Sequence, residues 1–138
     1  MSCNEQVNEN VGVVMGSNAD NCIFCKIVAG QIPARKVYED DELIAFHDIN
    51  PAAPIHLLIV PKTHIETLAD VRPADEAILG RMMAIAPRLA FENGAPAMPD
   101  GGLRVIMNVG PGGGQEVYHI HLHVLAGERP WRGFAQGV

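Results

Sequence analysis

The sequence lacks three features that would point to a membrane or an oxidising compartment: a long apolar run, a signal-like N-terminus and an even set of cysteines. No apolar stretch reaches the roughly 18 residues that a membrane helix needs. No basic residue precedes Lys26, so the N-terminus does not resemble a secretory signal. Three cysteines, an odd number, fit a reducing compartment better than a disulfide framework. We therefore expect a cytoplasmic protein without a membrane segment.

The chain also has few basic residues, ten against 16 acidic ones, which gives a net charge of −6. Because a nucleic-acid backbone needs a basic surface, we expect no nucleic-acid partner. A nucleotide stays open, since a small anion needs only local donors. The 138 residues, 48% of them hydrophobic, are enough for one globular domain with one core.

The organisation along the chain is read from periodicity and from glycine and proline positions. Residues 1–20 are rich in Asn, Gly, Ser and Val without periodicity, and we interpret them as a flexible leader before a single domain at 21–138 with a C-terminal tail. The patterned segments are a short helix at 22–29, strands at 37–39, 43–47, 56–60 and 103–107, a long helix at 74–92 and a last strand at 118–124. Pro87 predicts a kink in the long helix. Strands that follow one another with one long helix inserted predict an α+β fold with a mainly antiparallel sheet of about five strands.

Three histidines alternate with apolar residues in the last strand: His119, His121 and His123. Alternate side chains of a strand share one face, so three imidazoles are expected side by side, about 6.5–7 Å apart. That spacing suits a reaction centre the size of a phosphate or a metal ion. Two other interpretations stay open at this point, a zinc site and histidines with a purely structural role.

Two loops add polar groups. The glycine-rich segment 110–114 leads directly into the histidine run, and glycines let backbone N–H groups approach an anion, although a mobile hairpin loop is the alternative. Asp48 follows a strand and offers a carboxylate that accepts hydrogen bonds from both ribose hydroxyls. The alternative for Asp48 is a turn cap.

Cys22 and Cys25 have metal-ligand spacing, but they form a single pair. A structural zinc would need two further ligands, for which His64 and His119 are candidates. The alternative is two free thiols.

Several of these motifs together resemble the histidine triad superfamily, in its nucleotide-binding (Hint-type) branch. The motifs are C-I-F-C-K-I-V-A-G-Q-I-P-A, F-H-D-I-N-P-A-A-P-I-H, V-P-K-T-H-I and N-V-G-P-G-G-G-Q-E-V-Y-H-I-H-L-H-V-L-A-G. They run from about Cys22 to Gly127. The resemblance implies the histidine-triad fold, a homodimer whose sheets join across the interface, and hydrolysis of purine nucleoside phosphoramidates or adenylyl compounds to the nucleoside monophosphate.

The resemblance also implies roles for single residues. His121 would be the nucleophile that forms a nucleotidyl-histidine intermediate, His119 and His123 would contact the phosphoryl oxygens, and His56 would orient the triad from behind. Asp48 would hold the ribose. The implied base-pocket wall consists of Ile23, Phe24, Ile27, Phe46, His47 and Ile49, and the implied surroundings of the α-phosphate and the leaving group are Asn108, Gly114, Gln115 and Glu116. No cofactor is required for this catalysis.

Two positions depart from the family or are ambiguous within it. Glu116 stands where some relatives have a serine that assists the leaving amine, so the leaving-group preference is open. Trp131 lies one position nearer the histidine run than the tryptophan with which the tail of some relatives reaches the partner's active site, and the alternative is a tryptophan packed on its own subunit. Two further functions are carried as alternatives: a nucleotide-binding interaction protein with incidental hydrolysis, and a zinc hydrolase that uses the histidine strand.

Overall fold

The computed structural model describes residues 21–127. The expected leader at 1–20 and Trp131 lie outside the described residues. The main elements are α1 (Ile23–Val28), β1 (Lys36–Glu39), β2 (Leu43–His47), β3 (Ile55–Pro61), α2 (Glu76–Glu92), β4 (Leu103–Ile106) and β5 (Leu122–Ala126), with short 3₁₀ turns at Leu68–Asp70, Pro73–Asp75 and Pro111–Gly113. Among the described residues, no helix is long and apolar enough to cross a bilayer.

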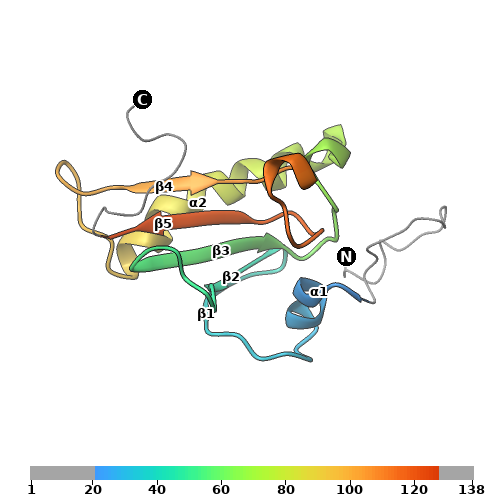
Figure 1. The fold of residues 1–138 in the computed structure, drawn as a ribbon, viewed down its shortest axis with the longest axis horizontal. Coiled ribbons are helices and arrows are strands. Elements are labelled where there is room, and N and C mark those ends of the chain that lie inside the picture. Colours follow the sequence, from blue (N-terminus) through green and yellow to red (C-terminus); the bar gives the residue numbers. More distant parts are fainter. Residues whose placement is uncertain (1–20, 128–138) are drawn as a thin grey trace.

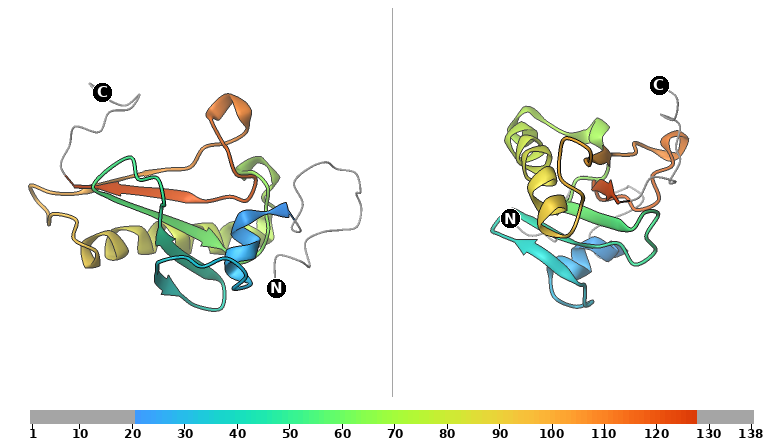
Figure 2. Two further views of the ribbon diagram at one scale, coloured as in Figure 1. Left: turned by 60° about the horizontal axis from the view of Figure 1, so that its bottom comes forward. Right: turned by 90° about the vertical axis from the view of Figure 1, so that its left-hand side faces the viewer.

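The five strands form one antiparallel sheet in the order β1-β2-β3-β5-β4. The long helix α2 covers one face of this sheet, and the short helix α1 lies against the opposite face (Figures 1 and 2). The expected α+β class, with about five antiparallel strands, one long helix and one short N-terminal helix, is therefore confirmed.

The two faces of the sheet bury two separate apolar clusters, because alternate residues of a strand point to opposite sides. On the α2 face, Leu57 and Ile59 of β3 pack with buried residues of the helix such as Met82 and Leu89. On the α1 face, the neighbouring positions of β2 and β3 pack against the short helix. This second cluster contains Cys22, Phe24, Cys25, Ile44, Phe46, Leu58 and Val60.

Helix α2 runs without a break through Pro87, as the sequence predicted. Pro87 and Met83 are both exposed, so the Met83 carbonyl, which has no hydrogen-bond donor at Pro87, lies on the solvent side of the helix. The helix ends at Glu92 with Asn93 as its C-cap, and Gly94 follows with φ +106°, a backbone conformation that disfavours side chains with a Cβ. The kink at Pro87 stays a prediction.

The last strand is shorter than expected. β5 begins at Leu122, so His119 and His121 precede it and the prediction of a strand across 118–124 is wrong for residues 118–121. The pairing of β5 with β3 stops at Leu122, opposite Ile59. Beyond that point Pro61 has no N–H to donate, its carbonyl accepts a hydrogen bond from His119, and the N–H of Ile120 donates to Ile65 instead.

Candidate active site

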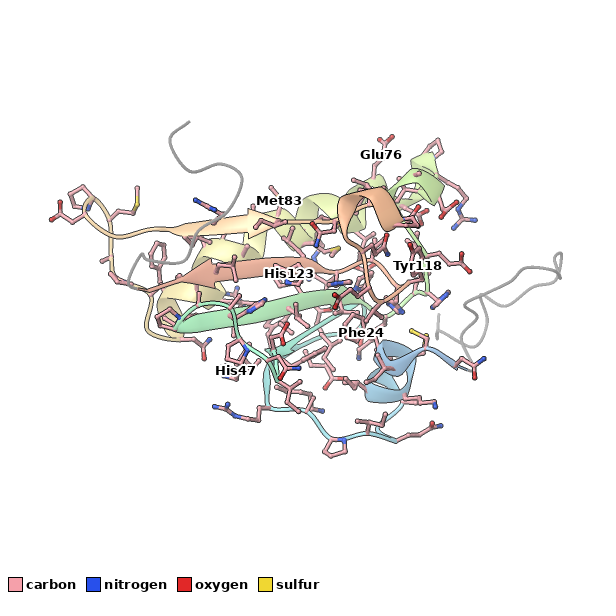
Figure 3. All side chains as sticks on the ribbon, viewed as in Figure 1. Phe24, His47, Glu76, Met83, Tyr118 and His123 are labelled. Atoms are coloured by element: carbon pink, nitrogen blue, oxygen red, sulfur yellow. The ribbon has the colours of Figure 1, made fainter. Side chains whose placement is uncertain are left out.

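A cavity of about 890 Å³ opens on the α1 face of the sheet. This volume lies within the range of small-molecule sites. Figure 3 shows Phe24 on α1, His47 at the end of β2 and His123 on β5 on the same side of the sheet. All three line the cavity.

Twelve of the fifteen residues predicted from the sequence as site residues line this cavity. They are Ile23, Phe24, Ile27, Phe46, His47, Asp48, Ile49, Asn108, Gly114, Glu116, His121 and His123. The apolar members come from α1, β2 and the loop after β2, and the polar members Asn108 and Glu116 lie on either side of the glycine-rich segment 110–114. His56, His119 and Gln115 do not line it.

The backbone fixes the tautomer of His121. Its Nδ1 lies 2.8 Å from the carbonyl oxygen of His119. A carbonyl only accepts, so Nδ1 carries the proton and donates, and Nε2 keeps its lone pair. Burial lowers the pKa of His121 below its usual value, which favours the neutral ring. A neutral imidazole with a bare Nε2 is the form that acts as a nucleophile.

A chain of hydrogen bonds fixes the opposite tautomer for His123, with the proton on Nε2 instead of Nδ1. The backbone N–H of Ala52 donates to Nδ1 of His56 at 2.9 Å, so in the neutral ring Nε2 of His56 carries the proton. That Nε2–H donates to Nδ1 of His123, also at 2.9 Å. Nε2 of His123 is then protonated and is a donor. Burial and the neighbouring imidazoles lower the pKa of His123 to about 4.

Asp48 both caps a turn and faces the cavity, so the two roles weighed for it coexist. Its Oδ1 accepts from the N–H of Asn50 at 2.7 Å, and its Oδ2 lies 3.4 Å from Nε2 of His56. Asp48, His56 and His123 are close enough together to suggest a metal site. The proton on Nε2 of His56 argues against one, because that nitrogen has no lone pair to offer.

His119 lies elsewhere than expected. Its side chain is fully buried, and its Nδ1 faces the cysteines of α1. The expectation that three imidazoles share one face, and that His119 contacts phosphoryl oxygens, is therefore wrong. β5 begins at Leu122 and residues 117–119 form a bend, so the strict alternation of a strand does not extend to residue 119.

Gln115 is also placed outside the cavity, against the prediction. Its side chain is buried and holds the glycine loop together. Nε2 of Gln115 donates to the carbonyls of Glu66 and Val117, and its Oε1 accepts from the N–H of Gly110 at 2.8 Å. These bonds satisfy the amide fully, so Gln115 shapes the loop instead of contacting a ligand.

The cavity has further lining residues that the sequence analysis did not single out: Ile32, Pro33, Ala34, Arg35, Pro51, Leu58 and Val117. For Leu58 a signal existed, since it stands two residues after His56 in the predicted strand 56–60, and alternate residues of a strand share a face. Arg35 had no such signal. Arg35 is exposed. Burial, and next to it the charge of Arg35, lower the pKa of His47, so the two side chains lie close together at the rim.

Behind the cavity, Cys22, Cys25, His64 and His119 form a buried cluster. The two Nδ1 atoms lie 3.2 Å apart, and the sulfur-to-nitrogen distances are 3.2–3.5 Å. Tetrahedral ligands at usual Zn–N and Zn–S lengths are separated by about 3.4 Å for two nitrogens and about 3.6 Å for nitrogen and sulfur. The four donors therefore fit a zinc ion closely.

Two further features suit a metal at this cluster. Nε2–H of His119 donates to the carbonyl of Pro61 at 2.7 Å, which leaves its Nδ1 as the nitrogen with the lone pair. A hydrogen bond with Cys25, together with the nearby imidazoles, lowers the pKa of the Cys22 thiol against the opposing effect of burial. A thiolate is the form that binds metal. This cluster does not open into the cavity, which disfavours a zinc hydrolase working through the histidine run.

Comparison with known proteins adds to this geometry. Residues 29–129 match the model of the HIT domain. The chain is 51% identical to protein HitA of Neisseria gonorrhoeae over 77% of this chain and 95% of that protein. It is 47% identical to the purine nucleoside phosphoramidase of Escherichia coli K12 over 79% of this chain and 89% of that protein. The crystal structure of a HIT family hydrolase from Legionella pneumophila Philadelphia 1 superposes with a TM-score of 0.73, at 51% identity over 79% of this chain and 95% of that chain.

Proposed function

Since this chain belongs to the histidine triad (HIT) family, we propose that it is a nucleotide-binding hydrolase that cleaves purine nucleoside phosphoramidates or related adenylyl compounds to the nucleoside monophosphate. The observation that carries the proposal is the hydrogen bond from Nδ1–H of His121 to the carbonyl of His119. It leaves the other ring nitrogen free for attack, on a residue that lines a cavity of nucleotide size.

In the first step, Nε2 of His121 attacks the α-phosphorus and the bond from phosphorus to the leaving nitrogen breaks. The leaving amine takes up a proton from solvent as it departs, and the nucleotide stays bonded to Nε2 of His121. In the second step, water attacks the same phosphorus and gives a proton back to solvent, the bond to Nε2 breaks, and the nucleoside monophosphate is released. One difficult displacement thus becomes two easier ones. The donor Nε2–H of His123 would stabilise the charge on a phosphoryl oxygen in both steps.

The remainder of the cavity suits the other parts of a nucleotide. Asp48 would accept hydrogen bonds from the ribose hydroxyls. The apolar walls from Phe24, Ile27 and Phe46 would enclose the base, and the backbone around Gly114, with φ +86°, lets the loop approach the phosphate closely.

We also propose that Cys22, Cys25, His64 and His119 hold a structural zinc ion. Bound there, zinc would supply a cross-link between α1, the loop after β3 and the segment before β5. No step of the proposed reaction depends on it.

The proposed assembly is a homodimer. One face of α2 carries five exposed residues without charge at the three- and four-residue spacing of a helix face: Ala77, Gly80, Met83, Ala84 and Pro87. The exposed charges Glu76 and Arg88 lie only at its two ends. Near this face a hollow of about 830 Å³, lined by Pro87, Phe91 and Met98 among others, lies beside the edge strand β4. An uncharged helix face beside an unpaired strand edge favours a second copy of the chain as partner.

The decisive experiment is intact mass spectrometry after rapid quenching with an adenosine phosphoramidate. We expect the mass of one adenylyl group on the wild-type chain, localised to His121 by fragmentation. His121→Ala should lose the adduct and at least about a thousandfold in kcat. Circular dichroism and AMP binding serve as the control for folding. Full turnover by a folded His121→Ala protein would refute the proposal. If cells that lack the protein show a defect and this variant corrects it, a nucleotide-binding interaction protein would be favoured.

A further inference from the structure

We propose that the cysteine–histidine cluster positions the wall of the base pocket, so that metal bound at the cluster sets the affinity for the nucleotide. This inference rests on the proposed function and on the zinc fit described above. The residue that joins the two sites is Phe24, which stands between Cys22 and Cys25 in the sequence and lines the cavity.

Helix α1 is too short to be stable alone. It has six residues, at most half of the roughly 12–15 that an isolated helix needs in water. It has no acidic residue in its first turn, and its cap is the sulfur of Cys22, which accepts from the N–H of Cys25 at 3.2 Å. Tertiary contacts must therefore hold α1 in place, and both cysteine sulfurs belong to the cluster.

Phe24 transmits this anchoring to the cavity. Its side chain is 6% exposed, and its ring meets three other rings edge-on. The centroid distances are 5.0 Å to His121, 5.8 Å to Phe46 and 6.0 Å to His119. Edge-on packing at these distances is favourable but depends on the position of the ring. A shift of α1 would move Phe24 relative to the nucleophile and open the wall.

The nucleophile itself has a second support that does not involve α1. Nε2–H of His119 donates to Pro61 of β3, and the carbonyl of His119 accepts from His121. Loss of metal should therefore disturb the pocket wall more than the orientation of His121. We expect the KM or Kd of the nucleotide to change more than kcat.

The effect should stay local because the two apolar clusters lie on opposite faces of the sheet. The cluster under α2 contains none of the residues of α1. The cluster under α1 depends on Cys22, Phe24 and Cys25. Release of the metal should loosen the second cluster while the first keeps the chain folded.

The test compares zinc-loaded wild-type protein with the same protein after chelation, using AMP as the probe. We expect chelation to weaken AMP binding about tenfold in calorimetry, which is the scale of losing one base–aromatic contact. Hydrogen exchange should rise at the amides of α1 and stay unchanged in the middle of α2. Cys25→Ser should reproduce both effects and lose zinc in elemental analysis.

Two further variants keep the test specific. Met82→Ala removes a buried side chain of the α2 cluster, so it should lower global stability and leave AMP affinity unchanged. Phe24→Leu should retain zinc yet bind AMP more weakly, and chelation should then weaken AMP binding little further. Equal effects of chelation in Phe24→Leu and wild type would overturn the role of Phe24.

Unchanged AMP affinity after complete chelation, or a protein that takes up no zinc, would overturn the inference as a whole. These outcomes differ from failure of the proposed function. In that case the zinc-loaded protein would not bind AMP at all or would form no adduct at His121, and the exchange of the α1 amides on chelation would alone decide whether the cluster positions the helix.

Discussion

His119, His121 and His123 differ in what their ring nitrogens contact. Nε2–H of His119 donates to Pro61, which leaves Nδ1 facing the cysteine sulfurs. Nδ1–H of His121 donates to a carbonyl, and Nδ1 of His123 accepts from His56. A histidine takes its role from the bond that its non-reacting nitrogen makes. The three residues thus become a candidate metal ligand, the proposed nucleophile and a hydrogen-bond donor.

The low pKa of His123, about 4 against an ordinary value of 6.5, predicts a loss of stability in acid. Between these pH values the unfolded chain binds more protons, so the free energy of unfolding should fall as the pH drops from 6.5 towards 4. Measured by urea unfolding, the drop in the free energy of unfolding from pH 7 to pH 5 should be about 1–2 kcal/mol smaller in His123→Asn than in wild type. An identical loss in both proteins would contradict this assignment.

Glu116 is an exposed carboxylate at the edge of the cavity, so it should select against negatively charged leaving groups. We expect wild type to prefer the adenosine phosphoramidate of ethylenediamine over that of β-alanine. Glu116→Gln should reduce this ratio of kcat/KM about two- to fivefold, since an exposed charge is strongly screened. Glu76→Gln, an exposed carboxylate on α2, is the matched control and should leave the ratio as it is.

Among the elements, α2 combines an apolar pattern that favours a helix with a proline that disfavours one. Apolar residues recur at helical spacing on both sides of Pro87, and the helix continues through it. Ala86, Leu89 and Ala90 next to the proline are buried. Burial of the apolar face offsets the missing hydrogen bond, because most of the stability of a helix in a protein comes from packing.

Replacing Pro87 with alanine should therefore stabilise the fold. The new N–H can donate to the carbonyl of Met83, four residues earlier, and the ring no longer crowds that turn. We expect a gain of about 1–3 kcal/mol in the free energy of unfolding, reduced by the greater freedom of the unfolded chain. Pro96→Ala, outside the helix, should give no comparable gain. A neutral or destabilising Pro87→Ala would mean that the proline contributes contacts that outweigh its cost.

For the whole molecule, the two faces of the sheet differ in what they carry. The face under α2 holds the larger apolar cluster, and the face under α1 holds the cavity and the cysteine–histidine cluster. None of the exposed uncharged residues of α2 lines the cavity, which lies on the opposite face of the sheet.

The proposed dimer gives a prediction at this scale. Met83 is 53% exposed at the centre of the uncharged α2 face, and a buried charge there would be costly. Met83→Glu should convert the dimer to a monomer, or weaken it by at least about tenfold, in sedimentation velocity. Gln31→Glu adds the same charge at an exposed position beyond α1 and should leave the dimer intact. A monomeric wild type, or a dimer unaffected by Met83→Glu, would contradict the proposed interface.

The sequence by itself determined the elements and most of the cavity wall. Periodicity, the glycines after α1 and α2, and the apolar strands are local properties, so they predicted the α+β class and the five-stranded sheet. The motif resemblance then identified the residues of the cavity, from Phe24 on α1 to His123 on β5.

The tertiary structure alone decided what each polar side chain does. Cys22 and His119 meet across 97 positions, and Gln115 reaches Glu66 across 49. Neither contact can be read from spacing, because it depends on how the segments before β5 and after β3 pass each other. The start of β5 was set in the same way, by the missing N–H of Pro61 on the neighbouring strand. Local patterns determine conformation, whereas the partner of a buried polar group is whatever the fold places beside it.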